Sequence, residues 1–370
     1  MMRVTYVCAD PGVPVFGSKG ASVHVQEVLR AFVRRGDDVD LVCVRRGGTA
    51  PAGLEGVAVH EVADDRAVGE ALAAGGRAVG PPDLVYERYS LTGRAGMRHA
   101  ADRRVPGVLE VNSPLIDEQR RHRGPVDSEA AQIVLRDAAT AASTVVCVSE
   151  PVADWVRALA PGSGVLVQSN GVDAERVRPG GRPPAGPMTV GFVGTFRAWH
   201  GLDDLMAAVA IVPDVRLLLV GDGPGRAACE VRATARDLDG RVTLTGSLPP
   251  AEVPAQLRRM HVGAAPAPPQ AGGYFSPLKV LEYLAAGLPV VASRTGPVEA
   301  LVEDGRDGLL VEPGDVEALA AALRRLRDDA GLRAALGTAA RSAALRHTWA
   351  GVLDRVVDHA FGTRVLAGVS

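Results

Sequence analysis

The segment from Ser276 to Glu282 (SPLKVLE) combines residues that could bind a phosphate group and a pair of sugar hydroxyls. Ser276 can cap a helix and Pro277 suits its first turn, so Leu278 and Lys279 are expected where backbone amides lack partners. The helix dipole and the Lys279 ammonium would attract a diphosphate. Glu282, on the same face, could accept hydrogen bonds from both ribose hydroxyls. These groups describe a nucleoside diphosphate site, and the competing interpretation is an ion pair on an ordinary helix.

Two glycine-rich loops could add to such a site. Gly194 to Gly201 (GTFRAWHG) carries Arg197 and His200, and Gly221 to Gly225 is GDGPG. Each loop follows an apolar run, and ligands of open parallel sheets collect beyond the carboxyl ends of the strands. The alternatives are solvated loop side chains in the first loop and simple turn geometry in the second.

The elements that must position these residues alternate between short apolar runs and helical patterns. In the first half, Arg3 to Cys8 is a candidate strand, Ser22 to Arg34 has apolar residues at helical spacing, and Val39 to Val44 resumes as a strand. Further strands are expected at Leu84 to Tyr86, Val108 to Val111, Val145 to Val148 and Val165 to Gln168. This alternation predicts a parallel sheet covered by helices.

The pattern is interrupted by a segment rich in proline and glycine and then begins again. The second half predicts strands at 189–194, 215–221, 242–246 and 289–293, and helices at 277–286, 316–328 and from there through 361. We therefore expect a Rossmann-like domain at 1–173, a linker at 174–188, a second Rossmann-like domain at 189–345, and a helix at 346–370 that packs on the first.

Composition excludes several classes of protein. The 370 residues carry a formal net charge of -2 with no long run of like charges, which does not favour nucleic-acid binding. No apolar run is long enough to span a membrane, and the N-terminus lacks a signal-peptide core. The four cysteines are widely spaced, which indicates neither disulfides nor zinc. We expect a cytoplasmic protein.

Two classes of protein that have a double α/β architecture and bind small molecules can be compared with this sequence. An NAD-dependent dehydrogenase would carry GxGxxG after a strand, and neither the first loop nor GDGPG has that spacing. A two-lobed solute-binding protein would bind without catalysis, and the missing secretion signal and the phosphate-directed Lys279 argue against it.

Several motifs in a fixed order resemble a known family. VGFVG…HGLDDL, LLLVGDGPG, SPLKVLEYLAAGLPVVAS and DGLLVEPGD, with GVPVFGSKGASVHVQEVLRAF and QSNGVD upstream, are similar to the retaining glycosyltransferases of family 4. The resemblance covers nearly the whole chain. It implies the GT-B fold, an α/β architecture of two doubly wound domains that face each other across a cleft.

The resemblance also implies site residues for a nucleotide-sugar donor in the second domain. The family has two glutamates with seven residues between them, and these positions fall on Tyr274 and Glu282, so Glu282 would hold the ribose. Thr195 and His200 occupy positions where the family carries basic phosphate ligands, and Arg197 could restore the missing charge. The residues expected to bind the donor are Gly20, Gly194, Arg197, His200, Gly221, Gly223, Tyr274, Ser276, Pro277, Leu278, Lys279 and Glu282.

By the same resemblance the acceptor would bind mainly to the first domain. The family's histidine near the fourth strand is replaced there by the segment from Tyr86 to Tyr89, and Asn112 follows the next strand. The competing interpretation is buried ionic pairing of Glu87 or Glu110 with Arg88. The residues expected at the acceptor are Ser18, Lys19, Glu87, Arg88 and Asn112.

A retaining reaction without an evident nucleophile implies front-face transfer, with the leaving diphosphate stabilised by Arg197 and Lys279. Glu87 and Arg88 complete the expected catalytic set. No cofactor or metal is expected. The donor would be of the UDP-glucose or UDP-N-acetylglucosamine type and the acceptor a small polar or secondary metabolite, as in antibiotic biosynthesis. Alternatives are a nucleotide-sugar 2-epimerase of the same fold, or transfer to a lipid-linked or cell-wall precursor. We expect a monomer or homodimer without integral membrane association.

Overall fold

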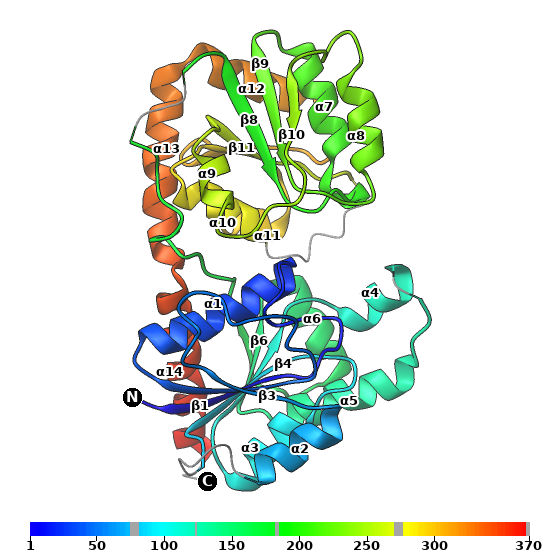
Figure 1. Ribbon diagram of the computed structural model, residues 1–370, viewed down its shortest axis with the longest axis vertical. Helices are drawn as coiled ribbons and strands as arrows, with labels where there is room; N and C mark the ends of the chain where they lie inside the picture. The colour runs from blue at the N-terminus through cyan, green and yellow to red at the C-terminus, as the bar shows by residue number, and fades with distance from the viewer. Residues whose placement is uncertain (75–80, 123, 182–184, 270–276, 368–370) are drawn as a thin grey trace. The chain divides into compact units, whose positions relative to one another are not determined.

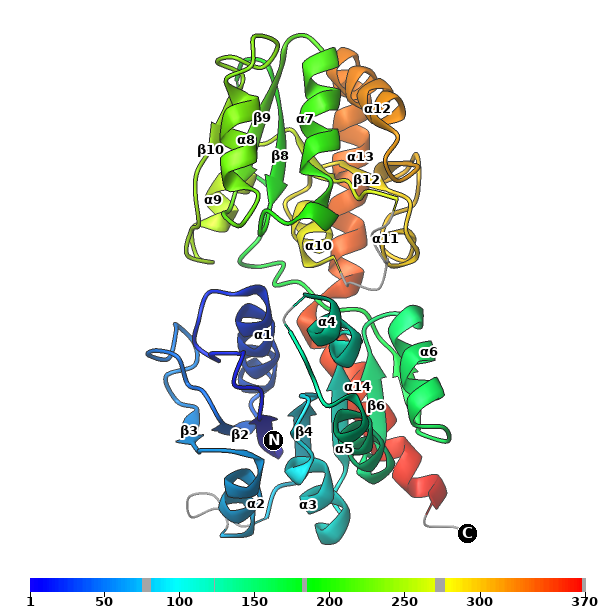
Figure 2. The same ribbon diagram turned by 90° about the vertical axis from the view of Figure 1, so that its right-hand side faces the viewer.

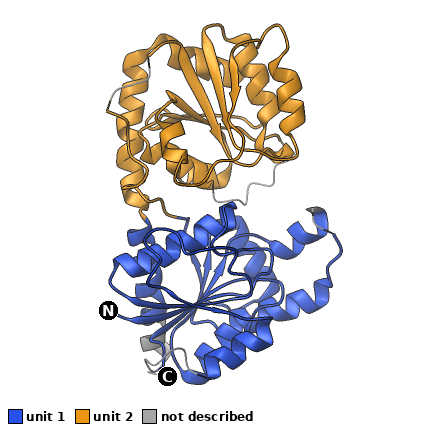
Figure 3. Cartoon of the chain, in the orientation of Figure 1, with its two compact units in different colours: residues 1–170, 349–370 blue, residues 171–348 orange. Residues whose placement is uncertain are grey.

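The chain forms two compact units. The computed structural model describes residues 1–74, 81–122, 124–181, 185–269 and 277–367. Unit 1 comprises residues 1–170 and 349–370, and unit 2 comprises residues 171–348 (Figure 3). The last helix, α14 (Trp349–Ala367), therefore belongs to unit 1 although it follows unit 2 in the chain. The assignment of acceptor and donor to these units stays a prediction.

Unit 1 is built on a parallel sheet with the strand order β3-β2-β1-β4-β5-β6-β7 (Figure 1). Most of its strands are short apolar runs with buried side chains, as in parallel sheets covered on both faces, whereas the two edge strands are only partly buried. The strands of this sheet are β1 (Arg3–Cys8), β2 (Asp38–Cys43), β3 (Ala58–Glu61), β4 (Leu84–Arg88), β5 (Gly107–Val111), β6 (Thr144–Cys147) and β7 (Val165–Val167).

Helices cover both faces of this sheet. On one face α1 (Gly20–Arg34) packs against α14, and on the other α2 (Asp65–Ala73), α3 (Ala95–Arg103) and α5 (Ser128–Ala141) pack in a row (Figure 2). α4 (Leu115–His122) and α6 (Glu150–Leu159) complete the described helices of the unit. β4 shows how the faces divide, because Tyr86 contacts Phe32 of α1 whereas its neighbour Glu87 contacts the start of α3.

Unit 2 repeats the architecture with the strand order β10-β9-β8-β11-β12-β13. Its strands are β8 (Met188–Val193), β9 (Val215–Val220), β10 (Val242–Leu244), β11 (Val262–Ala265), β12 (Val290–Ser293) and β13 (Gly308–Val311). One apolar core lies under α7 (Leu202–Ile211), α8 (Arg226–Ala233) and α12 (Val316–Asp328). A second lies under α9 (Val253–Leu257), α10 (Leu278–Ala285), α11 (Gly296–Glu299) and α13 (Ala330–Ala344). The predicted pair of Rossmann-like parallel α/β sheets is confirmed.

The strand order of each sheet reverses direction at one place, which is where ligands of such folds bind. In unit 2 the reversal lies between β8 and β11, and the segments that follow these strands lead into Gly194 and into α10. In unit 1 it lies between β1 and β4, followed by the α1 entry loop and by Tyr89.

Two local features differ from the sequence expectation. α10 begins at Leu278, with Pro277 as its N-cap residue, so the first turn starts one residue later than predicted. The segment expected to be a linker begins with packed residues, because Ala174 and Val177 are buried in unit 2. Proline and glycine content alone did not reveal this packing.

Candidate functional site

The loop after β8 leaves room for the ammonium of Lys279. Gly194 ends the strand with φ 141°, a conformation that other residues rarely adopt. A Cβ atom at Gly194 would lie 3.0 Å from Nζ of Lys279. The glycine therefore allows the lysine, which extends from the first turn of α10, to reach across the end of β8.

The surroundings of Lys279 disfavour the charged form of its ammonium group, because they exclude water. Its Nζ is 3.9 Å from the centroid of the Phe192 ring, a cation–π contact. Burial lowers the pKa of Lys279 to about 7, against an opposing effect of the Glu282 carboxylate. A diphosphate at this place would supply the anion that favours the charged ammonium.

His200 is held as a neutral ring. Its Nδ1 lies 2.6 Å from the backbone carbonyl of Thr195, which can only accept, so Nδ1 carries the hydrogen. Burial, and then the positive charges of Lys279 and Arg197, lower the pKa of His200 to about 3. At neutral pH its Nε2 therefore has a free electron pair and cannot donate to a phosphate oxygen in this arrangement.

Arg197 is exposed at the same strand end. Its guanidinium carbon lies 5.4 Å from the centroid of the Trp199 ring, and its charge acts on His200. The structure thus brings Arg197, His200 and Lys279 together, as predicted from their loops. With His200 neutral, Arg197 and Lys279 are the two basic side chains of this group that can carry a positive charge.

Gly221 and Gly223 serve the packing of the two loops. A Cβ atom at Gly221 would lie 2.0 Å from the carbonyl oxygen of Gly194, and one at Gly223 would lie 2.7 Å from the nitrogen of Phe196. The Phe196 amide donates to the Asp222 carbonyl at 2.9 Å. Close approach of the loops accounts for both glycines, and a contact with the nucleotide stays a prediction.

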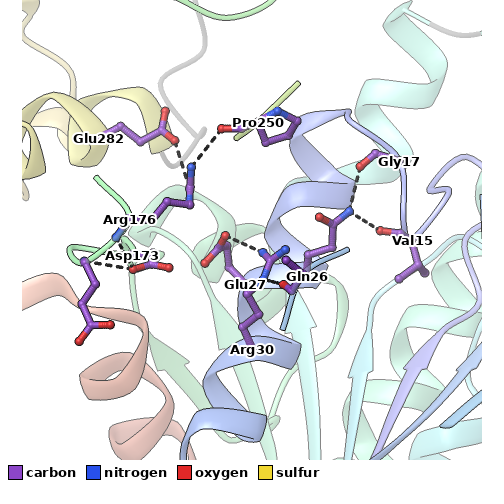
Figure 4. A network of polar contacts seen from close by, with 11 residues as sticks. Val15, Gly17, Gln26, Glu27, Arg30, Asp173, Arg176, Pro250 and Glu282 are labelled. Atoms are coloured by element: carbon purple, nitrogen blue, oxygen red, sulfur yellow. Dashed lines mark hydrogen bonds and ion pairs between the residues drawn. The ribbon is translucent and has the colours of Figure 1, made fainter. Parts of the chain in front are cut away.

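Glu282 lies on α10 next to a residue that sequence reasoning missed. Its Oε1 is 3.7 Å from Nη2 of Arg176, and both side chains are partly buried (Figure 4). The only sequence signal for Arg176 is its place three residues after the QSNGVD motif. Pro277 and Leu278, partly buried, precede Lys279 as expected, whereas Tyr274 and Ser276 lie outside the described residues.

In unit 1 the expected acceptor residues lie at three separate places. Arg88, at the carboxyl end of β4, lies 3.7 Å from Glu110 of β5, whose carboxylate also accepts from Tyr86 (2.7 Å) and Asn112 (2.9 Å). Nε2 of His24 approaches the same carboxylate at 2.9 Å. Although burial alone would raise it, His24 and then Arg88 and Tyr86 hold the pKa of Glu110 at about 2.

Glu87 is not part of this cluster. It points to the opposite face of the sheet, is fully buried, and accepts a hydrogen bond from the Met97 amide at 2.7 Å. Burial raises its pKa to about 8. The structure therefore does not bring Glu87 together with Arg88, because neighbouring residues of a strand face opposite sides.

The loop that leads into α1 is held by Gln26, whose amide donates to the carbonyls of Val15 and Gly17 at 2.8 Å. Ser18, Lys19 and Gly20 are exposed at the start of that helix. A Cβ atom at Gly20 would meet no described atom within 4 Å, whereas one at Gly17 would lie 2.9 Å from the Pro14 ring. Gly17 is therefore required by packing, and Gly20 borders open space.

Within 1–74, 81–122, 124–181, 185–269 and 277–367, no group of three or more His, Cys, Asp or Glu residues is placed to hold a metal ion. In the same ranges, no helix has the length and apolar character needed to cross a membrane. Metal independence stays a prediction.

Comparisons with known proteins agree with this geometry. A family model described as Glycosyltransferase Family 4 matches residues 18–176, and one described as Glycosyl transferases group 1 matches residues 187–329. D-inositol 3-phosphate glycosyltransferase from Saccharomonospora viridis is 30% identical, over 75% of this chain and 69% of that protein. The enzyme of the same name from Acidothermus cellulolyticus is 28% identical, over 95% and 85%.

Solved structures show the same fold at low identity. Sucrose-phosphate synthase from Thermosynechococcus elongatus superposes with a TM-score of 0.76 at 19% identity, covering 100% of both chains. HepE from Anabaena, solved with UDP and glucose, gives a TM-score of 0.71 at 19% identity, over 97% of this chain and 99% of that one. Because both family models match and a relative at 30% identity covers most of the chain, the chain belongs to the retaining glycosyltransferases of family 4 and has the GT-B fold.

Proposed function

We propose that this glycosyltransferase takes its sugar from a uridine diphosphate donor, of the UDP-glucose or UDP-N-acetylglucosamine type. The observation that carries the proposal is the arrangement at the start of α10. Lys279 reaches over Gly194 toward the end of β8, and Glu282 lies one turn further along the helix. A charge that suits the diphosphate and a carboxylate that suits the ribose therefore lie on one helix, which supports the proposal. That HepE was solved with UDP and glucose supports the choice of base and sugar.

The proposed acceptor is a small polar molecule, and a secondary metabolite such as an antibiotic precursor belongs to this class. The similarity to enzymes named D-inositol 3-phosphate glycosyltransferases supports a small polar acceptor. In unit 1, Arg88 offers a guanidinium at a strand end beside the reversal of the sheet. Its Nε and Nη1 are buried and have no hydrogen-bond partner among the described residues, so they would favour an acceptor with oxygen atoms.

The proposed reaction is a front-face transfer. The bond between the anomeric carbon and the diphosphate oxygen breaks, and the acceptor oxygen bonds to that carbon on the same face. The acceptor's proton passes to the leaving diphosphate. Negative charge grows on that diphosphate in the transition state, where Arg197 and Lys279 would stabilise it. This mechanism places no demand on a metal ion.

The proposed compartment is the reducing cytoplasm. All four cysteines, Cys8, Cys43, Cys147 and Cys229, are buried free thiols. Burial raises the pKa of Cys43 and of Cys147 to about 12, so both behave as small apolar side chains. Because none of the four thiols forms a disulfide, the fold does not depend on an oxidising compartment.

The ribose contact can be tested by calorimetry. Glu282→Ala should weaken UDP binding by about 1.5–3 kcal/mol, the range for hydrogen bonds to a charged group, without changing the melting temperature of the free protein. Glu175→Ala, which removes an exposed carboxylate nearby, is the matched control and should bind UDP like the wild type. Equal UDP affinity for Glu282→Ala and wild type would contradict the assignment.

The transfer itself is tested with radiolabelled UDP-sugars and a panel of polar acceptors that includes D-inositol 3-phosphate. Label should move to an acceptor, and UDP should be released in equal amount. Conversion of the UDP-sugar in the absence of any acceptor, to an epimer, would contradict the proposed reaction.

A further inference from the structure

The segment that follows the QSNGVD motif is fixed in unit 2 by its own turn. The carboxylate of Asp173, itself buried, accepts hydrogen bonds from the backbone amides of Glu175 (3.1 Å) and Arg176 (3.0 Å). The amide of Val177 donates to the Asp173 carbonyl at 2.9 Å, and the Val177 side chain is fully buried. The backbone at Arg176 is therefore held from both sides.

Arg341 hydrogen-bonds both to this turn and to α10, the helix that carries Glu282. Arg341 of α13 donates to the carbonyls of Ala174 (2.9 Å) and Val177 (3.0 Å), and also to the carbonyl of Ala285 at the end of α10 (2.7 Å). Through Arg341, the turn and α10 form one assembly. The distance between the backbones of Arg176 and Glu282 is thereby fixed.

The guanidinium of Arg176 lies between the segment that follows β10 and Glu282 of α10. Its Nη1 donates to the Pro250 carbonyl at 3.3 Å, in the segment after β10, and its Nη2 lies 3.7 Å from Oε1 of Glu282 (Figure 4). The latter distance is too long for a hydrogen bond, so Arg176 acts on the carboxylate through its charge.

We propose that Arg176 is a positioning residue that holds the Glu282 carboxylate charged and oriented for the two ribose hydroxyls of the donor. The inference rests on the proposed ribose contact of Glu282. Ribose that covers Glu282 removes water from the carboxylate, and an unpaired charge would then oppose binding. Arg176 supplies the opposite charge from a fixed backbone.

The test compares UDP with 2′,3′-dideoxyuridine diphosphate, which lacks both hydroxyls, by titration calorimetry. Wild type should prefer UDP by roughly 10- to 150-fold, the range for hydrogen bonds to a charged group. Arg176→Met should reduce this preference about fivefold, as expected for loss of one partly exposed ion pair. Arg176→Lys should recover part of it, because the charge remains. A general loss of structure would weaken both ligands equally and leave the ratio unchanged.

Controls separate this inference from the function on which it rests. Arg178→Met, at an exposed arginine two residues away, should leave the ratio unchanged. In a Glu282→Gln background, which should itself remove most of the preference, Arg176→Met should have no further effect. With UDP-sugar and acceptor, Arg176→Met should raise the donor KM while kcat changes little.

Two outcomes would refute different statements. If Glu282→Gln removes the preference but Arg176→Met keeps it at the wild-type value, Arg176 has no positioning role and the ribose contact stands. If wild type shows no preference for UDP, or Glu282→Gln retains it, the ribose contact itself is wrong, and the inference fails with it.

Discussion

Donor binding should take up a proton, because Lys279 must be charged to hold a diphosphate. With a pKa of about 7 in the free protein, about one lysine in ten is protonated at pH 8. A bound diphosphate raises that pKa, so about 0.9 proton should enter with each UDP at pH 8. UDP affinity should then fall with rising pH, approaching tenfold per unit between about pH 8 and the pKa of the bound state.

His200, next to Lys279, does not titrate in this pH range, because its pKa is lowered to about 3 and the ring stays neutral. In unit 1, burial raises the pKa of Glu87 to about 8, so Glu87 could also exchange a proton in this pH range. The control must therefore be a variant that retains Glu87 and changes only Lys279. Lys279→Arg provides one, because it retains a positive charge at all these pH values while the rest of the protein is unchanged.

The measurement is calorimetric titration of UDP in two buffers of different ionisation enthalpy, from pH 7 to 9.5. The difference between buffers gives the number of protons bound. Wild type should show uptake and Lys279→Arg should show none, with a nearly constant affinity. Wild-type affinity that does not depend on pH, or equal proton uptake by the two proteins, would refute the assignment of Lys279 to the diphosphate.

Three further predictions concern turnover, packing and metal. Arg197→Ala should lower kcat by about 10²–10³-fold and weaken donor binding less, because the diphosphate gains charge in the transition state; Arg197→Lys should recover part of the rate. Gly221→Ala should lower the melting temperature, since its Cβ would lie 2.0 Å from the Gly194 carbonyl at φ 141°. Turnover should persist in EDTA, because two basic side chains neutralise the diphosphate.

For each of these three predictions, one experimental result would contradict the reasoning. A normal rate for Arg197→Ala, with a collapse for His200→Ala, would transfer the phosphate role to the histidine. Gly296→Ala is the control for the glycine, since a Cβ there meets no described atom within 4 Å; equal melting of both variants would contradict the packing argument. Complete loss of activity in EDTA, restored by Mn²⁺ or Mg²⁺, would show that the diphosphate site requires a metal.

The fold was predictable where local pattern and burial agree. β1 has the predicted bounds, Arg3–Cys8, because an apolar β-branched run in a buried parallel strand is recognisable without its neighbours. β3 (Ala58–Glu61) was not predicted, since its four residues at the sheet edge are only partly buried and half of them are polar. β11 (Val262–Ala265) was missed because alanine and glycine give little strand signal.

The candidate site was predictable where both partners share one element. Lys279 and Glu282 lie three residues apart on a helix, so their common face follows from its period. Arg176 could not be placed in this way. Its position depends on hydrogen bonds from Arg341, 165 residues further along the chain, to three backbone carbonyls. The opposite orientations of Glu87 and Arg88 follow from strand geometry, but which of them faces α1 depends on the packing of α3.

The position of α14 in unit 1 has a consequence for biosynthesis. Unit 2 is one continuous stretch of chain, whereas unit 1 takes α14 from beyond it, so that unit 2 is topologically an insertion in unit 1. Trp349 of α14 contacts His24, and His359 lies 3.1 Å from the hydroxyl of Thr144 on β6. During translation the ribosome must therefore complete unit 2 before the core of unit 1 can close. Until α14 has been made, the sheet of unit 1 lacks that helix on the face that α14 shares with α1.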